Sequence, residues 1–371
     1  MRTLRRLLYG ELLVAVGFAL LAFLALFSFF NFVDQLPSIG QASVLDPDKV
    51  YGLWQATLYV LLLLPNLMYQ LLPITLLIGT VFVLVRMAQA SEYTILRTSG
   101  LGPGRALRTL LSLGSVFVLL TFAVGDYLAP VTARQAEMLR ASYRGNISVG
   151  QTGAWLKERQ GEHQFSVNVG ALDPEGGMRA IKIFEFDQQG RFVSSTQARQ
   201  GSVSGEGSWS LEGVDRRQMN AGQSAFGIRT EQLERATWRT GITTEMLAAA
   251  LMQPDKMRTL DLFIYIRHLE ANNQNAQRYE IEFWRKVFYP LSCLVMVVLA
   301  LPFAYLHFRS AGVAGYVFLG VMLGMSFYML NNLFGYIGNL RAWQPWLAAA
   351  SPAMVYSIGS LGAFGWLVLR R

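Results

Sequence analysis

The sequence is poor in charge and in the residues that usually build catalytic, metal-binding or disulfide-linked sites. Charged residues make up 15% of the 371 residues, against roughly 25% in soluble domains, whereas 53% are hydrophobic and the mean hydropathy is +0.32. The single cysteine, Cys293, has no partner for a disulfide, and the three histidines at 163, 268 and 307 lack metal-ligand spacing. This composition predicts a membrane protein that holds neither a metal nor a cofactor.

Motifs for nucleotide binding and catalysis are also missing. No glycine is followed directly by a lysine, so the chain has no P-loop with which to bind ATP. The apolar runs lack the buried acids of a proton-driven carrier, since Glu11 lies at the edge of its run. A lipid-modifying enzyme would need a cluster of acids, histidines or metal ligands, and none is visible. The chain is therefore predicted not to be an enzyme, and any transport must draw its energy from another chain.

Apolar runs dominate what is present. Six of them reach the roughly 20 residues that a transmembrane helix needs, at 12–33, 54–85, 106–128, 287–307, 313–337 and 346–369. Three runs before residue 131 and three after residue 286 flank a polar block of about 150 residues, the size of one domain. The second run is too long for one straight span, and Pro65 and Pro73 are expected to kink or break it.

Basic residues in the short loops predict the orientation. Arginines precede the first run, lie between the second and third runs, and end the chain as Arg370 and Arg371. Positive residues collect on the cytoplasmic side, so both termini are expected there and the polar block outside. The formal net charge of +8 is then explained largely by arginines at membrane borders, and it requires no nucleic acid.

The polar block has the pattern of a β-sheet. Short runs that alternate apolar and polar residues occur at 154–159, 164–169, 181–186, 191–196 and 209–214, separated by Gly, Asp and Asn. They predict an antiparallel sandwich or roll with one buried face and with Trp155 and Trp209 in its core. A helix that lies at the membrane interface is expected over residues 259–271.

A short polar segment, residues 88–104, joins the second and third runs. Ser91 can cap a helix whose first turn holds Glu92, and Gly100 is placed to end that helix. Two interpretations stay open. The segment is either a polar turn that only reverses the chain, or a short helix with Glu92 and Arg97 that contacts a separate motor protein.

Polar residues at the end of the first run are candidates for a substrate path. Asn31 interrupts the apolar run, and Asp34 and Gln35 follow where lipid headgroups begin. The alternative is a plain helix end at the interface, because polar residues at this depth are common there as well as along substrate paths.

Basic residues on the outer side are candidates for contacts with phosphates. Arg140 and Arg144 share one helix face, and Glu137 can pair with Arg140. This face is either a solvated continuation of the third span or a basic patch that meets phosphates. Lys286, next to Arg285, is either an ordinary interfacial anchor or a second basic site that faces substrate.

Several short motifs occur in an order that resembles one family. They are Phe32-Val-Asp-Gln-Leu36, the Pro65/Pro73 spacing, Ser91-Glu92 with Ser99-Gly100, Ala129-Pro130, and the stretch from Pro254-Asp255 through Arg278-Tyr279, Trp284, Lys286 and Pro290-Leu291. In this order the chain resembles, nearly end to end, the LptF/LptG-type permease subunits of the bacterial lipopolysaccharide exporter. It looks closer to the LptG type than to the LptF type.

The resemblance implies a transmembrane permease subunit of an ATP-driven exporter in the bacterial inner membrane. Residues 1–130 would form a first transmembrane half, 131–258 a periplasmic jelly-roll-like β domain, and 259–371 an amphipathic helix with a second transmembrane half. Glu92, Tyr93, Leu96, Arg97 and Gly100 would belong to a coupling helix that docks on the ATPase. The non-transporting alternative is a membrane scaffold for an envelope-spanning assembly.

The same resemblance implies several partners. They are a cytoplasmic ABC ATPase dimer, an LptF-type permease, a single-span LptC-like protein, an LptA-like periplasmic bridge and lipopolysaccharide itself. One departure matters: family members often carry lysines where this chain has Asn31, Pro37 and Ser38. More of the phosphate contact would then depend on Arg140 and Lys286.

Overall fold

The computed structural model describes most of the chain. The described residues are 2–41, 50–92, 95, 102–144, 154–172, 177–204, 207–222, 225–243, 246–247, 253–305 and 312–369. They divide into two compact units. The helical unit comprises Met1–Leu36, Val60–Ala133 and Glu280–Arg371, and the sheet unit comprises Pro37–Tyr59 and Arg134–Tyr279.

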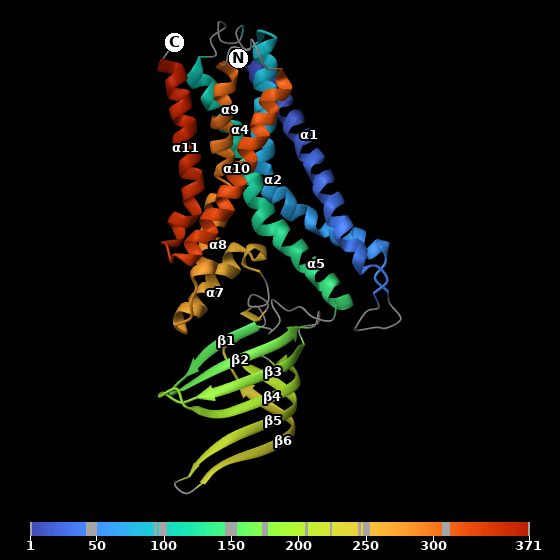
Figure 1. The fold of residues 1–371 in the computed structure, drawn as a ribbon, viewed down its shortest axis with the longest axis vertical. Helices are drawn as coiled ribbons and strands as arrows, with labels where there is room; N and C mark the ends of the chain where they lie inside the picture. Colours follow the sequence, from blue (N-terminus) through green and yellow to red (C-terminus); the bar gives the residue numbers. More distant parts are fainter. Residues whose placement is uncertain are drawn as a thin grey trace. The chain divides into compact units, whose positions relative to one another are not determined.

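Helices account for the expected spans (Figure 1). In chain order they are α1 (Arg2–Gln35), α2 (Leu53–Gln89), α4 (Pro103–Ala123), α8 (Gln277–Phe288), α9 (Ser292–Ala300), α10 (Val313–Leu340) and α11 (Pro345–Leu369). Five helical segments of the described chain are long and apolar enough to cross a membrane, and α8 with α9 makes a sixth if that bent pair is one span. The expectation of a helical membrane protein is confirmed.

Two of the expected spans differ in detail from the prediction. The α4 helix continues through a π-helical turn, η2 (Val124–Leu128), into α5 (Ala129–Arg144), so the third span does extend beyond its apolar run. The fourth run is not straight: α8 and α9 meet at an angle of 50° around Pro290, and a 3-10 helix, η4 (Leu301–Tyr305), follows. Pro290 has no N–H for a helical hydrogen bond, which suits a bend at this position.

Helix α2 runs through both of its prolines without interruption, so of the two expected outcomes, a kink or a break, the break does not occur. Figure 1 shows that α2 changes direction along its length, which is the kink that was the other expectation. Side-chain hydroxyls donate hydrogen bonds to backbone carbonyls near Pro73. The Thr75 hydroxyl donates to the carbonyls of Leu71 and Leu72, and the Tyr289 hydroxyl donates to the carbonyl of Gln70. Such side-chain donors explain how a membrane helix tolerates a proline in its interior.

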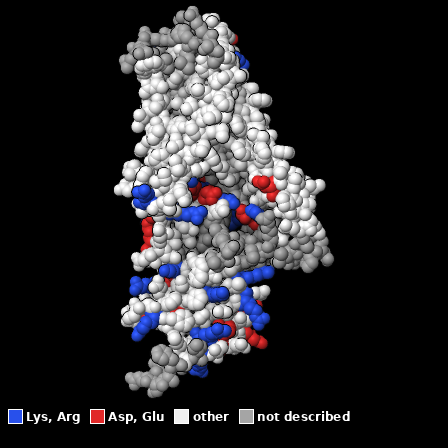
Figure 2. All heavy atoms as spheres, viewed as in Figure 1, with Lys and Arg blue, Asp and Glu red and all other residues white. Residues whose placement is uncertain are grey.

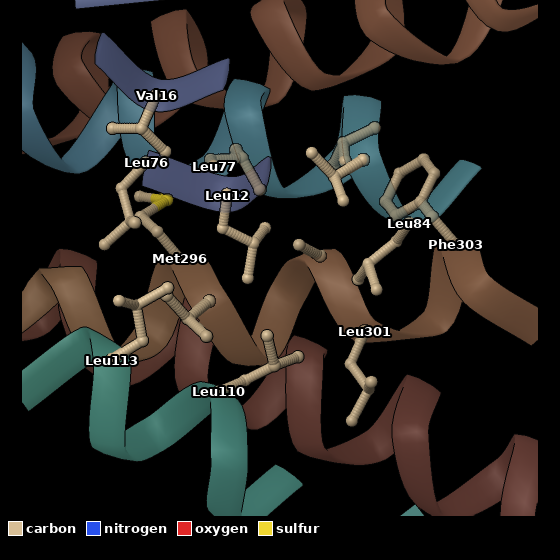
Figure 3. Close-up of a cluster of buried hydrophobic side chains, with 14 of the residues drawn as sticks. Leu12, Val16, Leu76, Leu77, Leu84, Leu110, Leu113, Met296, Leu301 and Phe303 are labelled. Carbon is tan, nitrogen blue, oxygen red and sulfur yellow. The ribbon is translucent and has the colours of Figure 1, made fainter. Parts of the chain in front are cut away.

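Apolar side chains form the main buried cluster of the helical unit (Figure 3). Leu76 and Leu77 of α2 are fully buried and meet Leu12 of α1 and Met296 of α9. Helices α1 and α2 approach each other closely at Gly79, where an added Cβ would lie 2.7 Å from the backbone nitrogen of Val16. Glycine is required there because any larger side chain would force α1 away from α2.

The sheet unit contains six antiparallel strands. They are β1 (Ala154–Gln160), β2 (His163–Leu172), β3 (Met178–Phe186), β4 (Phe192–Val203), β5 (Ser208–Gly222) and β6 (Ala225–Arg239), paired in chain order. The five alternating runs lie in β1 to β5, so the inserted antiparallel β domain is confirmed, whereas β6 was not foreseen. The described strands form a meander, and the jelly-roll detail stays a prediction.

Tryptophan burial follows the prediction only in part. Trp209 is fully buried, and its indole N–H donates to the carbonyl of Ile242. Trp155 is 49% exposed and stacks on Phe184, so its predicted place in the core is wrong. Alternation fixes which residues share a face of a strand, but it does not say which face packs on the core.

Polar contacts join the first and last strands at one end of the sheet. The carboxylate of Glu158 in β1 accepts hydrogen bonds from the Thr240 hydroxyl and the Gly241 N–H, both just after β6. The amide of Gln160 donates to the carbonyl of Arg239 at 2.8 Å. Because β1 and β6 are the outermost strands of the order, these bonds make the sheet curl at this end.

The edge of β1 that does not pair with β2 is occupied by side chains of the same unit. The N–H of Lys157 donates to the Gln274 side chain at 3.3 Å, and the N–H of Arg159 donates to the Asn272 side chain at 3.1 Å. Both acceptors follow helix α7 (Thr259–Ala271), which matches the predicted helix in its bounds.

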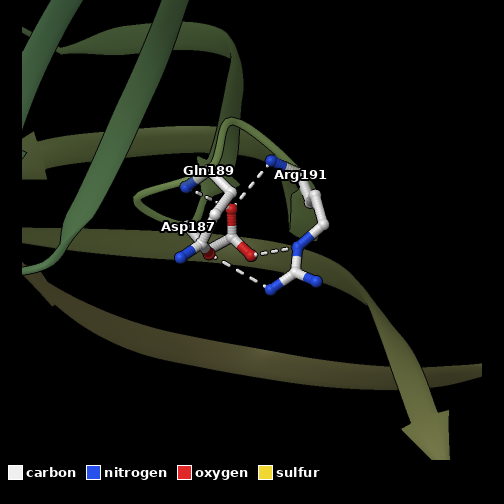
Figure 4. Close-up of polar contacts among 3 residues, drawn as sticks. All are labelled: Asp187, Gln189 and Arg191. Carbon is white, nitrogen blue, oxygen red and sulfur yellow. Dashed lines mark hydrogen bonds and ion pairs between the residues drawn. The ribbon is translucent and has the colours of Figure 1, made fainter.

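A charged turn joins β3 to β4 (Figure 4). The Asp187 carboxylate accepts from the N–H groups of Gln189 and Arg191 and pairs with the Arg191 guanidinium at 2.7 Å. The N–H of Arg191 is the main reason that the pKa of Asp187 lies below its usual range. Figure 2 shows such charged side chains over the sheet, while uncharged residues cover much of the helical unit on that face.

Candidate functional site

An apolar groove lies among α1, α2 and α10 of the helical unit. Its volume is about 810 Å³. The lining is mostly apolar, with Glu11 and Arg86 as its two charged members: Gly10, Glu11, Val14, Ala15, Phe18, Ala19, Phe23, Ile78, Gly79, Phe82, Val83, Arg86, Val313, Ala314, Val317 and Val321. A groove of this size with almost no polar lining suits the hydrocarbon part of an amphiphile.

An ion pair marks one end of this groove. The Arg86 guanidinium lies 2.6 Å from the Glu11 carboxylate and 5.9 Å from the centre of the Phe82 ring. Both charged side chains are partly exposed, so the pair contributes little to folding stability. The sequence placed both residues at the same membrane border, but 75 positions separate them and only the fold shows that they touch.

Lys286 lies inside the helical unit. Its side chain is 5% exposed, and the ammonium donates to the carbonyl of Gly125 in the π-helical turn at 3.3 Å. Burial at this level is not that of a snorkelling anchor, because such a lysine keeps its ammonium in water. The neighbouring Arg285 bonds Glu282 and Asn332 instead. The predicted contact between Lys286 and substrate stays a prediction.

Gly125 allows an aromatic ring to pack against the same turn. A Cβ at this position would overlap the ring of Tyr69 in α2, so a glycine is needed. The Lys286 ammonium and the Tyr69 ring therefore meet the π-helical turn at the same residue. Such turns often occur at functional sites, since the extra residue re-aims the side chains that follow.

Arg140 belongs to a cluster of aromatic and polar residues in the sheet unit. Its guanidinium lies 6.0 Å from the centre of the Tyr59 ring. The expected pairing of Glu137 with Arg140 is replaced by an ion pair between Glu137 and Lys256 at 2.7 Å. Lys256 follows Glu137 by 119 residues, so a rule based on helix spacing could not find it. Arg140 is thus a partly buried cation held by an aromatic face.

The coupling segment is described only at its start. Glu92 is helical and exposed directly after α2, and the N–H of Ile95 donates to the carbonyl of Ser91 at 3.1 Å. Ser91 has a positive φ of 58°, which turns the chain sharply at the end of α2. Tyr93, Leu96, Arg97 and Gly100 lie outside the described residues.

Comparison with known proteins decides the family. Residues 6–370 match the family described as lipopolysaccharide export system permease LptF/LptG. The chain belongs to this family. Two proteins named lipopolysaccharide export system permease protein LptG, from Escherichia coli strains K12 and CFT073, are each 29% identical over 344 residues, which is 92% of this chain and 91% of theirs. The protein of that name from Haemophilus influenzae is 27% identical over 372 residues, 100% of this chain and 99% of its own.

Membership in the LptF/LptG family settles the class of the molecule. It is a permease with several membrane-spanning helices and an inserted β domain, and it is a transporter subunit rather than an enzyme. The relatives that match over most of the chain carry the name LptG, as the sequence motifs indicated.

The remaining predicted site residues of this LptF/LptG permease lie at the end of α1 or in α5. Asn31 donates to the carbonyl of Phe27 in its own helix at 2.7 Å, Asp34 is exposed and Gln35 is buried. The side chain of Arg144 lies outside the described part of the chain. Asn31, Asp34 and Gln35 thus lie on the last turns of one helix, whereas Lys286 and Arg140 fall in different units.

Sequence reasoning missed the groove and its ion pair. The groove forms where three helices from distant parts of the chain meet. The periodicity of apolar residues within one helix does not show which other helices pack against it. The signal that was available is the pair of charges, Glu11 and Arg86, each close to one end of an apolar run. Charges at such depth mark functional positions often enough to justify testing them as a pair.

Proposed function

We propose that this LptF/LptG-family permease is the membrane subunit of an ATP-driven exporter. It would extract lipopolysaccharide from the inner membrane and pass it to a periplasmic bridge toward the outer membrane. The absence of a P-loop from the sequence supports a separate ATPase. The proposed assembly holds a cytoplasmic ABC ATPase dimer, an LptF-type permease, a single-span LptC-like protein and an LptA-like bridge protein.

The groove among α1, α2 and α10 carries this proposal. Its apolar lining suits acyl chains, and it is open on one side, as one half of a cavity shared with a second permease would be. The exposed apolar side chains of α1 include Val14 at 74% and Phe18 at 75%, and both line the groove. Such surfaces require lipid or another apolar helix next to them.

The orientation and domain division are part of the proposal. Both termini lie in the cytoplasm, and the β domain lies in the periplasm. Residues 1–130 and 259–371 are the transmembrane halves, the second with its amphipathic helix, around the β domain at 131–258. The support for this arrangement is the arginines in the short loops together with six spans, if the bent pair of α8 and α9 is counted as one of them. It places Glu92 on the cytoplasmic side, where the ATPase would be.

Phosphate contacts are proposed for the basic residues on the periplasmic side. Arg140 has the geometry for this role, because a guanidinium held against an aromatic ring keeps donors for a phosphate. Asn31, Asp34, Gln35, Arg144 and Lys286 complete the proposed substrate residues. Lys286 could reach a phosphate only if its contact with Gly125 opened.

The direct test of export uses the purified complex in membranes. Proteoliposomes that contain this permease, the ATPase and lipopolysaccharide should transfer lipopolysaccharide to an LptA-like acceptor only when ATP is hydrolysed. A scaffold would assemble with the same partners but give no ATP-dependent transfer. Assembly without transfer in an otherwise complete system would contradict the exporter.

The coupling role is tested by Glu92→Lys. Loss of one side of a partly desolvated charge pair costs about 2–5 kcal/mol of binding, so co-purification of the ATPase should fall strongly. Thermal stability should hardly change, because Glu92 is exposed. Glu231→Lys, at an exposed position of β6, changes the net charge equally and is the matched control. If both variants recovered the same amount of ATPase, residues 88–104 would be a polar turn that only reverses the chain, and the coupling role would be refuted.

A further inference from the structure

Helix α7 has an apolar stripe that its own unit leaves exposed. Leu260 is 66% exposed, Phe263 46% and Ile264 47%, and the spacing of three and four residues places them on one face. Arg267 continues this stripe, and its guanidinium lies 5.3 Å from the centre of the Phe263 ring. The α7 stripe, defined here as Leu260, Phe263, Ile264 and Arg267, is therefore an apolar strip with a cation at one end.

The opposite face of α7 is used for packing within the sheet unit. Leu262, Tyr265, Ile266 and Leu269 are all buried. Two apolar faces on a helix of 13 residues exceed what the sheet unit needs to hold it. The exposed stripe is thus available to an apolar surface other than its own core.

The chain ties α7 to the start of a membrane-spanning segment. Only residues 272–276 separate α7 from α8, which begins the bent spanning pair. At about 3.3–3.6 Å per residue, this linker cannot carry the end of α7 more than roughly 20 Å from α8. The two helices lie closer together than this limit, because the rings of Tyr265 in α7 and Tyr279 in α8 meet edge to face with their centroids 4.8 Å apart.

We propose that α7 binds the surface of the lipid bilayer through this stripe. Leu260, Phe263 and Ile264 would enter the boundary between headgroups and acyl chains, while Arg267 meets lipid phosphate. The flanking residues Asp261 and Glu270 are exposed, as is usual for helices that lie in the interface plane. The inference goes beyond export, because it names the side chains through which the helix expected at the membrane interface over residues 259–271 would meet lipid.

The test measures the depth of a spin label in the full-length chain. The protein is reconstituted into nanodiscs of phosphatidylethanolamine and phosphatidylglycerol with a nitroxide on Ile264→Cys. Native Cys293 is fully buried, so the label reacts at the introduced thiol. Leu21→Cys, 68% exposed on α1, supplies the lipid reference, and Glu231→Cys on β6 supplies the aqueous reference.

The expected result is a label at 264 that oxygen reaches more readily than a water-soluble nickel complex does, as at Leu21. Leu260→Asp should reduce the fraction of that label in lipid roughly tenfold, because half-burial of a leucine is worth about that factor. A label as accessible to nickel as the one at Glu231 would overturn the proposal. So would a label shielded from both reagents, since a protein partner would then cover the stripe.

Discussion

The helical unit and the sheet unit are held together by different interactions. The helical core is one cluster of buried hydrophobic side chains, most of them leucine and valine. The sheet unit also depends on charged contacts, among them Glu158 with Thr240 and Gly241 and the ion pair of Asp187 with Arg191. The two units therefore suit different surroundings. The helical unit is stabilised by apolar packing, as expected in lipid, whereas the sheet unit also uses polar and charged contacts, as expected in water. Because charged contacts depend on protonation, we expect the stability of the sheet unit to respond to pH.

The largest effect is expected at the core of the sheet. Trp209→Ala should destabilise the sheet unit by about 3–5 kcal/mol, because a fully buried indole and its bond to Ile242 are lost. Trp155→Ala is the matched control, since this side chain is half exposed and should cost much less. Hydrogen exchange of the β4, β5 and β6 peptides in the full chain measures both. If both variants lost the same stability, the exposed fraction of the side chain would not explain what each tryptophan contributes.

The helical unit offers a pair of leucines for the same comparison. Leu76→Ala in α2 should cost about 2–5 kcal/mol, because the side chain is fully buried among α1 and α9 residues. Leu21→Ala on α1 removes the same atoms from a position 68% exposed and should cost under about 0.5 kcal/mol. Thermal unfolding in lipid nanodiscs measures the difference. If Leu21→Ala proved as costly, the exposed face of α1 would be packed against a protein partner in that preparation.

A smaller effect is expected where the first and last strands meet. Glu158→Gln keeps the shape of the side chain but loses the charge that accepts from Thr240 and Gly241. Hydrogen bonds to a charged group contribute about 1.5–3 kcal/mol when buried, and Glu158 is only partly buried, so about 1 kcal/mol is expected. Faster hydrogen exchange at the end of β6, with unchanged exchange in α2, would show that the polar contacts hold the curl. Unchanged exchange in both β6 and α2 would mean that the polar contacts of Glu158 do not stabilise the sheet unit.

The smallest effect is a dependence on pH. Burial lowers the pKa of the His268 imidazole in α7, and the Glu158 carboxylate partly opposes this shift. The unfolded chain then binds a proton near pH 6.5 while the folded chain does not, so the stability of the sheet unit falls as pH drops below about 6.5. His268→Gln should flatten that fall. Hydrogen exchange of α7 between pH 7.5 and 5.5 measures it, and an equally steep fall in the variant would point to another group.

Much of the fold could be predicted from local pattern. Long apolar runs indicated the spans, and alternation indicated β1 to β5, because both signals lie within one element. Strand β6 was missed because most of its described side chains are exposed and several are charged, among them Glu231 and Arg235, as is typical of an edge strand. The bend at Pro290 was missed, although a proline inside an apolar run is the same signal that predicted the kink of the second run.

Local chemistry predicted only the position of one candidate residue. Glu92 is helical and exposed, as the dipole argument predicted, while its coupling role stays a prediction. The contact of Lys286 with Gly125 and the pair of Glu11 with Arg86 join distant parts of the chain. Both depend on how helices pack, and a single sequence does not record that packing.

The outer edge of β1 is blocked by side chains of the same unit. The side chains of Asn272 and Gln274 accept hydrogen bonds from backbone N–H groups of β1 that an incoming strand would need. β6 is the margin at the other end of the strand order. A strand from another β domain therefore cannot pair with β1 at Lys157 and Arg159 unless Gln274 and Asn272 first release these N–H groups.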